Sequence, residues 1–340
     1  MAETSTGTGT TGRNQPLGDT ELRLMQRLAQ QITATDLELV NSDATYGELA
    51  WNWGRAHRAE SGSWRHRLWF DGTDGTDRTD LIAWAWAALP REVPRADGTV
   101  RDYTDAYLTY QIHPDHNTLI DDVIGWYEQT AAGVRRTLVT QAADQVAQAR
   151  WAAHGYTPES DSTDDSTSDS SADDGDWTQL NTRDLEDIET PDLPDGFAFT
   201  TAADAGPGAT VRAHLAAWPA STMTDDAYQG LLQAPGYRPD LHLLIQAPDG
   251  TMAASAVMWL DPANATVEFE PVGTHPGFRR LGLGRALVLH GLHTARAAGA
   301  SHATVACLGA PAHPKARGLY YSVGFRYFSR DVLLAKAAVQ

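Results

Sequence analysis

The chain has 340 residues, with 44 acidic and 26 basic side chains and a formal net charge of −18 at pH 7. This balance disfavours binding to nucleic acid, which proteins hold through positively charged contacts to phosphate, and it favours a cationic small substrate. No apolar run approaches the roughly 20 residues that a membrane span needs, so we predict a globular protein that is not inserted in a membrane. Cys307 is the only cysteine, which excludes an internal disulfide and a cysteine-based zinc site and suits a reducing cytoplasm.

Two segments of unusual composition divide the chain. Residues 1–18 are mostly Thr, Gly and other small polar residues, without the basic start or apolar stretch of an export signal, so we predict a disordered tail. Residues 158–176 contain no basic and no large apolar residue, and we predict an acidic Ser/Asp-rich linker over 158–190. Because a domain averages about 150 residues, we expect two domains, 19–157 and 191–340.

The second half of the chain alternates expected strands with expected helices. Apolar and β-branched runs bounded by Gly, Pro and Asp predict the strands, and apolar residues at helical spacing predict the helices. The strands are expected at 195–202, 241–247, 251–260, 266–274, 302–308 and 324–335, and the helices at 211–218, 225–232, 284–298 and 319–323. In the first half, residues 105–126 follow a similar plan of strand, turn and helix. Strands interleaved with helices predict an α/β layer fold.

Two glycines one residue apart stand in the segment HPGFRRLGLGRALVLHG, residues 275–291, where the helix at 284–298 begins. Since glycine has no Cβ, a backbone built on Gly282 and Gly284 can approach a ligand closely with its amides outward, next to the positive end of a helix dipole. That arrangement favours phosphate binding, although a tight strand-to-helix connection also explains the glycines. The nucleotide-triphosphate loop is excluded because Gly-Lys-Ser/Thr is absent, and the dinucleotide fingerprint fails because Leu287 replaces its third glycine.

The chain resembles the GNAT superfamily of acyl-CoA-dependent N-acyltransferases in two motifs. The first is Arg or Gln, two residues, Gly, one residue and Gly or Ala, which is met by Arg279, Gly282 and Gly284. The second lies in AHPKARGLYYSVGF, residues 312–325, where His313 replaces the usual Asn and the pattern is met by Ala316, Leu319, Tyr320, Gly324 and Phe325. The resemblance covers about residues 193–335. It implies a mixed sheet flanked by helices and acetyl-CoA as the co-substrate.

The resemblance also implies residue roles in acyl transfer. Tyr320 matches the tyrosine that protonates the leaving thiolate, Glu268 stands where members with a glutamate base carry it, and Glu270 is the alternative base. Backbone amides near Val272 would stabilise the charge that develops on the attacked carbonyl oxygen. No metal is expected, and the residues expected to contact the cofactor are Val272, Gly273, Thr274, Arg279, Arg280, Leu281, Gly282, Leu283, Gly284, Arg285, His313 and Tyr320.

Purely structural explanations remain for several of these residues. Glu268 also fits a surface carboxylate at a strand start, and Tyr320 fits a core aromatic residue. Cys307 in its apolar strand fits a buried small residue better than a nucleophile, and the histidines around it show no metal-ligand spacing. The region before the second strand suits an acceptor pocket, or alternatively a core with a charged helix start, through Trp218, Tyr228, Tyr237, Asp225 and Asp226.

The first half is interpreted as a degenerate copy of the same fold. When His113-Pro114 is aligned without gaps on His275-Pro276, Ile120 and Asp122 fall on the two motif glycines, and a carboxylate there would repel a diphosphate. Trp151 replaces the tyrosine acid. Core packing is the favoured role, with an interface as the alternative, for Trp51, Trp53, Trp64, Trp69, Trp84 and Trp86. The tandem plan is distantly similar to that of mycothiol synthase, whose first domain, however, keeps a glycine-rich loop.

These inferences predict an N-acetyltransferase that transfers an acetyl group from acetyl-CoA to a primary amine of a small molecule by direct attack. The alternatives are an acyl-CoA-binding regulatory module without transfer and a protein N-acetyltransferase. The expected partner is a small-molecule amine, and neither nucleic acid nor a membrane is expected as a partner. The expected location is the cytoplasm. The sequence leaves the oligomeric state open, a homo-oligomer included.

Overall fold

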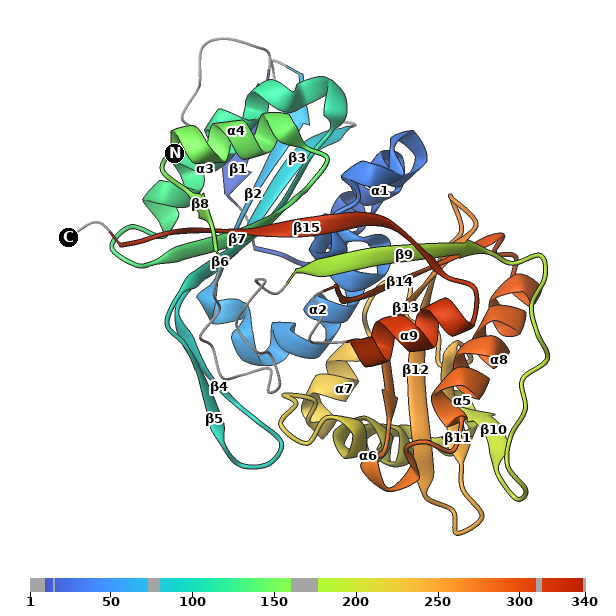
Figure 1. Cartoon of the computed structure of the whole chain (residues 1–340). Helices are drawn as coiled ribbons and strands as arrows, with labels where there is room; N and C mark the ends of the chain where they lie inside the picture. Colours follow the sequence, from blue (N-terminus) through green and yellow to red (C-terminus); the bar gives the residue numbers. More distant parts are fainter. Residues whose placement is uncertain (1–9, 15, 73–79, 160–176, 310–313, 339–340) are drawn as a thin grey trace.

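The computed structural model describes residues 10–14, 16–72, 80–159, 177–309 and 314–338. Its two halves share one large mixed sheet, with helices packed on both faces (Figure 1). The predicted fold class, an α/β layer fold with a mixed sheet flanked by helices, is confirmed. Within the described ranges no helix combines the length and the apolar character that a membrane crossing requires.

Among the described residues the large sheet has 13 strands. The path on the first-half side is β1 (Thr10–Asn14), β2 (Trp64–Asp71), β3 (Leu81–Ala88), β6 (Ala106–Ile112) and β7 (Arg136–Gln141). After β15 (Arg326–Lys336) it continues through β9 (Thr178–Asp184), β14 (His302–Leu308), β13 (Thr266–Thr274), β12 (Met252–Asp261), β11 (His242–Gln246) and β10 (Ala198–Thr201). The short β8 (Thr157–Pro158) pairs with β15, and β4 (Arg91–Pro94) forms a separate hairpin with β5 (Val100–Tyr103).

Strand β15 joins the two halves. Its first residues, from Arg326 to Arg330, pair with β9, and its last residues, from Asp331 to Lys336, pair with β7. Figure 1 shows this strand running between the two halves of the sheet. The first half therefore completes its sheet with the C-terminal strand of the chain.

The helices follow the same division. The first half contains α1 (Asp19–Thr35), α2 (Tyr46–Glu60), α3 (Ile120–Thr130) and α4 (Gln145–Ala153). The second contains α5 (Ala202–Ala205), α6 (Pro207–Ala217), α7 (Asp225–Leu231), α8 (Leu283–Ala297) and α9 (Pro314–Ser322). Short 3-10 turns occur at Leu37–Leu39, Ser42–Ala44, Ser61–Ser63, Pro114–Leu119 and Pro276–Phe278. The apolar stripe predicted for the helix at 284–298 is buried in α8, which ends before Gly299 at φ 101°.

One hydrophobic cluster crosses the boundary between the halves. It joins side chains of α1, α2, β2 and β3 to Val211 of α6, Leu231 of α7 and Trp259 of β12. Five of the six tryptophans considered in the sequence analysis belong to it, and the sixth, Trp69, packs under α3 and α4. The sequence presented core packing and an interface as alternatives for these tryptophans. In the structure the same cluster serves as core and as the contact between the halves.

Two segments are more ordered than their composition suggested. Thr10–Asn14, expected in the disordered tail, form strand β1 at the edge of the sheet, antiparallel to β2. Thr178–Asp184, expected in the linker, form β9, a central strand between β14 and β15. Two polar side chains of β9, Gln179 and Asn181, are buried and hydrogen-bonded, as when Asn181 donates to the Val305 carbonyl at 3.1 Å. Polar composition alone therefore misplaced this strand in the linker.

Candidate active site

Strands β13 and β14 run parallel and then diverge. Their register covers Thr266–Phe269 opposite His302–Val305, whereas β13 continues to Thr274 and β14 to Leu308. Beyond Phe269 a bulge sets Glu270 and Pro271 opposite the single residue Val257 of β12. The edge of β13 that faces β14 is thus unpaired from Glu270 onward, at the carboxyl ends of the two strands.

The direction of the β13 amides follows from the pairing with β12. The His275 N–H donates to the Ala253 carbonyl at 2.9 Å, so the N–H of Gly273, two residues earlier, also faces β12. Because these groups alternate along a strand, Val272 and Thr274 direct their N–H groups toward the opening between β13 and β14. This is the placement expected for the cofactor arm and for stabilising a developing oxyanion.

Helix α8 begins at this opening without a side-chain cap. Its N-cap is Gly282, in the left-handed conformation at φ 79° and ψ −1°, and no side chain hydrogen-bonds to its first turn. Arg280 also has a positive φ, 65°, so the turn before the helix contains left-handed residues on both sides of Leu281. The first-turn amides of Leu283, Gly284 and Arg285 are therefore free to bind an anion, assisted by the helix dipole.

The side chains around this turn leave its outer face accessible. Arg279, Arg280 and Leu281 are exposed, and within the described ranges neither arginine forms an ion pair. Gly284 faces Thr274 Oγ1 and Leu319 Cδ2, each 3.4 Å from a Cβ placed on it. Arg285 forms an ion pair of 2.7 Å with Glu189. The uncapped amides and this accessible turn fit the diphosphate of coenzyme A.

Tyr320 lies on α9, which packs against β14 and α8. Its side chain is 6% exposed and contacts the Phe325 ring edge-on at 5.9 Å, and its hydroxyl has no hydrogen-bond partner among the described residues. Burial raises the pKa of this hydroxyl, and the nearby charge of Glu270 raises it further. Tyr320 is thus protonated at neutral pH and lies near Glu270, which suits a proton donor.

Glu268 is engaged by the first half of the chain. The Thr45 hydroxyl donates to its carboxylate at 2.6 and 2.8 Å, and the Gly47 N–H donates to Oε2 at 3.1 Å. With 8% exposure, burial raises the pKa of Glu268 to about 7 even though these hydrogen bonds lower it. Glu268 therefore lies at the N-terminus of α2 and is buried between the halves, which the expected surface position did not foresee.

Glu270 lies at the bulge, where β13 leaves β14. Burial raises the pKa of Glu270 to about 8, with a further contribution from the charge of Glu268. Its carbonyl accepts the Trp259 indole N–H at 2.9 Å, and within the described ranges its carboxylate has no hydrogen-bond donor. Compared with Glu268, Glu270 is the less constrained of the two expected bases.

The expected acceptor region between α6 and β11 forms a packed core. Tyr228 is 2% exposed, and its hydroxyl lies 2.9 Å from that of Tyr237, which continues at 3.0 Å to the buried His242. Trp218 lies directly on Gly273, where a Cβ would come within 2.4 Å of its ring. Asp226 pairs with Arg58 at 2.8 Å, and Asp225 stands beside it in the first turn of α7. These contacts fit the structural explanation for Tyr228 and Tyr237, whereas Trp218 is partly buried and Asp225 and Asp226 are exposed, so an acceptor role for this region stays a prediction.

Cys307 and the histidines show no catalytic arrangement in the described ranges. Cys307 is buried, its Sγ accepts the Asn181 amide at 3.4 Å, and burial raises the pKa of the thiol. No group of three or more potential metal ligands occurs within the described residues. His313, expected to contact the cofactor, lies outside the described residues.

In the first half, strands β6 and β7 also run parallel and then separate, and side chains fill the space between them. Strands β6 and β7 pair in parallel only from Ala106 to Leu108, and beyond this the Trp151 indole donates to the Tyr110 hydroxyl at 3.0 Å. The cavity that remains beside Tyr110 measures about 60 Å³. Helix α3 starts after the buried Leu119, and Asp121 and Asp122 occupy its first turn.

Sequence reasoning missed the contribution of α2 to this site. Thr45 caps α2 by accepting the Glu48 N–H at 3.0 Å, and the spacing of these two residues is typical of a helix start. That signal could have located the helix. It could not have shown that the helix ends on β13, because Thr45 and Glu268 are 223 residues apart in the sequence.

The comparisons with known proteins agree with this architecture. Residues 209–325 match the sequence model of the acetyltransferase (GNAT) family, so the chain contains a GNAT acetyltransferase domain. A search of the curated proteins finds no match.

Several solved structures share the fold over nearly the whole chain. A tandem GNAT protein from the clavulanic acid biosynthesis pathway superposes with a TM-score of 0.60 at 14% identity, over 97% of this chain and 99% of that one. A GCN5-related N-acetyltransferase from Sphaerobacter thermophilus gives 0.54 at 17% identity, over 97% of each chain. A GNAT-family acetyltransferase from Colwellia psychrerythraea gives 0.54 at 12% identity, over 95% and 99%. These likenesses establish the fold.

Proposed function

We propose that the protein is an N-acetyltransferase that transfers an acetyl group from acetyl-CoA to a primary amine of a small molecule by direct attack. The observation that carries the proposal is the uncapped N-terminus of α8 beside the opening between β13 and β14, with the Tyr320 hydroxyl near it. The match of residues 209–325 to the acetyltransferase (GNAT) family supports acyl transfer in general.

Coenzyme A would be held by backbone groups. The first-turn amides of α8, from Leu283 to Arg285, would bind its diphosphate, and the outward N–H groups of Val272 and Thr274 would bind its arm. The exposed Arg279 and Arg280 add positive charge at this surface. Bound acetyl-CoA supplies an activated thioester carbonyl.

Different residues of the site carry out the two proton transfers of the proposed reaction. An acceptor that enters as an ammonium first gives one proton to solvent, and Glu270 takes the second proton from the nitrogen, directly or through water, as the amine attacks. The Val272 N–H stabilises the negative charge on the carbonyl oxygen as the C–N bond forms. Tyr320 donates its proton to the departing thiolate, so that free thiol leaves and the amide remains, and the proton held by Glu270 then returns to Tyr320 through water. Glu268 holds the same face of β13 against α2.

In this proposal the first half is a degenerate copy of the fold. It packs against the second half and provides walls of the acceptor pocket. Tyr110 and Trp151 fill its opening, and acidic residues stand where an anion would bind. The similarity of the tandem plan to mycothiol synthase stays a prediction.

The test is release of free thiol from acetyl-CoA with a panel of small primary amines. We expect amine-dependent release by the wild-type protein and a loss of about 100-fold or more in kcat for Tyr320→Phe, the size typical of a lost general acid. Coenzyme A affinity should stay within about twofold, because Tyr320 acts after binding.

Two alternatives make different predictions in this assay. An acyl-CoA-binding regulatory module would bind coenzyme A but release no thiol with any amine. A protein N-acetyltransferase would acetylate peptide N-termini or lysines in preference to the amine panel. Unchanged kcat in Tyr320→Phe would remove Tyr320 from the mechanism.

A further inference from the structure

A cavity of about 810 Å³ lies in the first half of the molecule. Tyr107 and Thr109 of β6 line it, whereas Leu108 and Tyr110, which alternate with them, pack on the opposite face under α3 and α4. Further walls come from α2, β7 and the hairpin β4–β5, together with residues of β2, β3 and β15. The hairpin is tied to the second half, because the Ala96 N–H donates to the Ser221 carbonyl at 3.0 Å. Cavities that hold small organic ligands typically measure about 300–1,000 Å³.

One end of this cavity reaches the candidate active site through α2. Glu48 lines the cavity, and Glu48 also lies one residue after Gly47, whose N–H donates to Glu268 on β13. Burial and the neighbouring charges of Glu270 and Glu268 raise the pKa of Glu48. The cavity therefore ends at the first turn of α2, where the Gly47 N–H bonds to Glu268, two residues before Glu270 on β13.

This end of the cavity is acidic. Glu48 accepts a hydrogen bond of 2.7 Å from the Asn52 amide, and Asp43 accepts one from the Tyr107 hydroxyl. Neither carboxylate forms an ion pair with another described residue. Arg55 stands nearby, with its guanidinium hydrogen-bonded to Asn52 and Thr222. Several carboxylates thus share one cation, and a bound ammonium would relieve their mutual repulsion.

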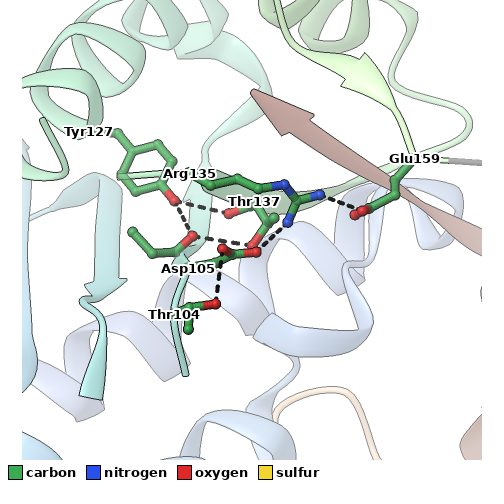
Figure 2. Close-up of polar contacts among 7 residues, drawn as sticks. Thr104, Asp105, Tyr127, Arg135, Thr137 and Glu159 are labelled. Atoms are coloured by element: carbon green, nitrogen blue, oxygen red, sulfur yellow. Dashed lines mark hydrogen bonds and ion pairs between the residues drawn. The ribbon is translucent and has the colours of Figure 1, made fainter. Parts of the chain in front are cut away.

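The far wall is built from charges that are already paired. Figure 2 shows Arg135 between the carboxylates of Asp105 and Glu159, with Tyr127 and Thr137 bonded to the backbone beside it. Arg91 forms an ion pair of 2.5 Å with Glu60. Over the whole lining, six carboxylates stand against four guanidinium groups, so the cavity keeps an acidic surplus. Carboxylates and hydroxyls there offer hydrogen-bond acceptors to a ligand rich in donors.

We infer that this cavity binds the acceptor: an extended primary amine whose reacting ammonium lies between Glu48 and Glu270 and whose donor-rich body fills the space toward Thr109 and Arg135. This inference rests on the proposed function and adds to it the place and chemical class of the acceptor. The first half, which has lost the features of a diphosphate site, then contributes the acceptor site of the second.

The test uses the full-length protein with coenzyme A and three amines. n-Butylamine is short enough to occupy only the acidic end, whereas spermidine and neamine are long and rich in donors. Glu48→Gln should raise KM for all amines by about 10-fold, the loss expected for one charged contact of about 1.4 kcal/mol. Thr109→Phe narrows the cavity and should raise KM for the long amines by at least as much, while KM for n-butylamine and affinity for coenzyme A stay within about twofold.

The control is Glu92→Gln, an exposed carboxylate on β4 outside the cavity. This variant should behave as wild type with every amine. If the wild-type protein is active but Glu48→Gln and Thr109→Phe keep wild-type KM for every amine, the cavity is not the acceptor site. Calorimetric titration with the long amines separates the two claims. If the wild-type protein binds these amines without turning them over, and Thr109→Phe abolishes the binding, the proposed function is overturned and the cavity assignment stands.

Discussion

At the scale of single residues, the proposed mechanism makes the protonation of Glu270 control when the amine can attack the thioester. Burial raises the pKa of Glu270 to about 8, so at neutral pH most molecules carry it protonated and unable to accept a proton. Its basic form accumulates only as the pH rises through this value. The rate of acetyl transfer to the amine should therefore be low in acid and approach a plateau above about pH 8.

We predict this pH profile for kcat/KM with trifluoroethylamine, an amine that is already neutral at pH 7. The rate should rise about tenfold per pH unit below the Glu270 pKa, and Glu270→Gln should lower kcat by about 100-fold and flatten the rise. Glu268→Gln is the comparison that distinguishes the two expected bases. A profile that flattens in Glu268→Gln and not in Glu270→Gln would assign the base to Glu268.

The sequence identified these chemical groups but not their surroundings. The strand containing Glu268 and Glu270 could be located from its apolar pattern, and the motif containing Tyr320 from its resemblance to the GNAT superfamily. The engagement of Glu268 by Thr45 could not, because a contact across 223 residues leaves no local signal. The packed state of Tyr228 and Tyr237 likewise depends on which side chains meet in three dimensions.

At the scale of elements, the N-terminus of α2 is the contact between the halves that lies nearest the candidate chemistry. The Thr45 side chain accepts the Glu48 N–H and donates to Glu268, so one hydroxyl supports both the helix and a buried carboxylate. Removing it leaves a helix donor and a carboxylate oxygen short of partners.

We predict that Thr45→Ala lowers the free energy of unfolding by about 1–2 kcal/mol, the usual cost of a lost N-cap. Thr45→Ser, which keeps the hydroxyl, should lose less than half of this. Denaturant unfolding at pH 8 measures both variants. Equal stability of Thr45→Ala and the wild type would show that the hydroxyl contributes nothing to this contact.

Periodicity predicted the second-half elements well, because their apolar residues line a single core. The expected strands at 266–274 and 302–308 match β13 and β14, and the helix expected at 284–298 matches α8 to within one residue at each end. Strand β9 was missed because its buried side chains Gln179 and Asn181 are polar and are stabilised by hydrogen bonds within the fold.

At the scale of the whole molecule, the two halves are physically continuous. Strand β15 pairs with β9 in one half and β7 in the other, and a hydrophobic cluster containing Trp51 and Trp259 spans the boundary. Separating the halves would expose this cluster and break the hydrogen bonds of β15. The chain division into domains 19–157 and 191–340 stays a prediction, but neither segment contains all the strands of its own half.

We therefore predict a single cooperative unfolding transition for the full chain, with the calorimetric enthalpy equal to the van't Hoff enthalpy. Tryptophan fluorescence, which is dominated by the first half, and hydrogen exchange of β13 in the second half should report the same midpoint. Two separated calorimetric peaks would mean that the halves unfold independently despite the shared strand.

The account depends most on the binding of coenzyme A by the turn before α8, and calorimetric titration tests this directly. The wild-type protein should bind coenzyme A, and Gly282→Val should weaken binding at least about tenfold, because a β-branched residue is strained at a φ of 79° and blocks close approach to the amides. Gly250→Val is the matched control, since Gly250 has a φ of 85° and equally open surroundings in the turn between β11 and β12. Normal binding in Gly250→Val with loss in Gly282→Val is the predicted result, and binding that survives in Gly282→Val, or no binding by the wild-type protein, would contradict the account.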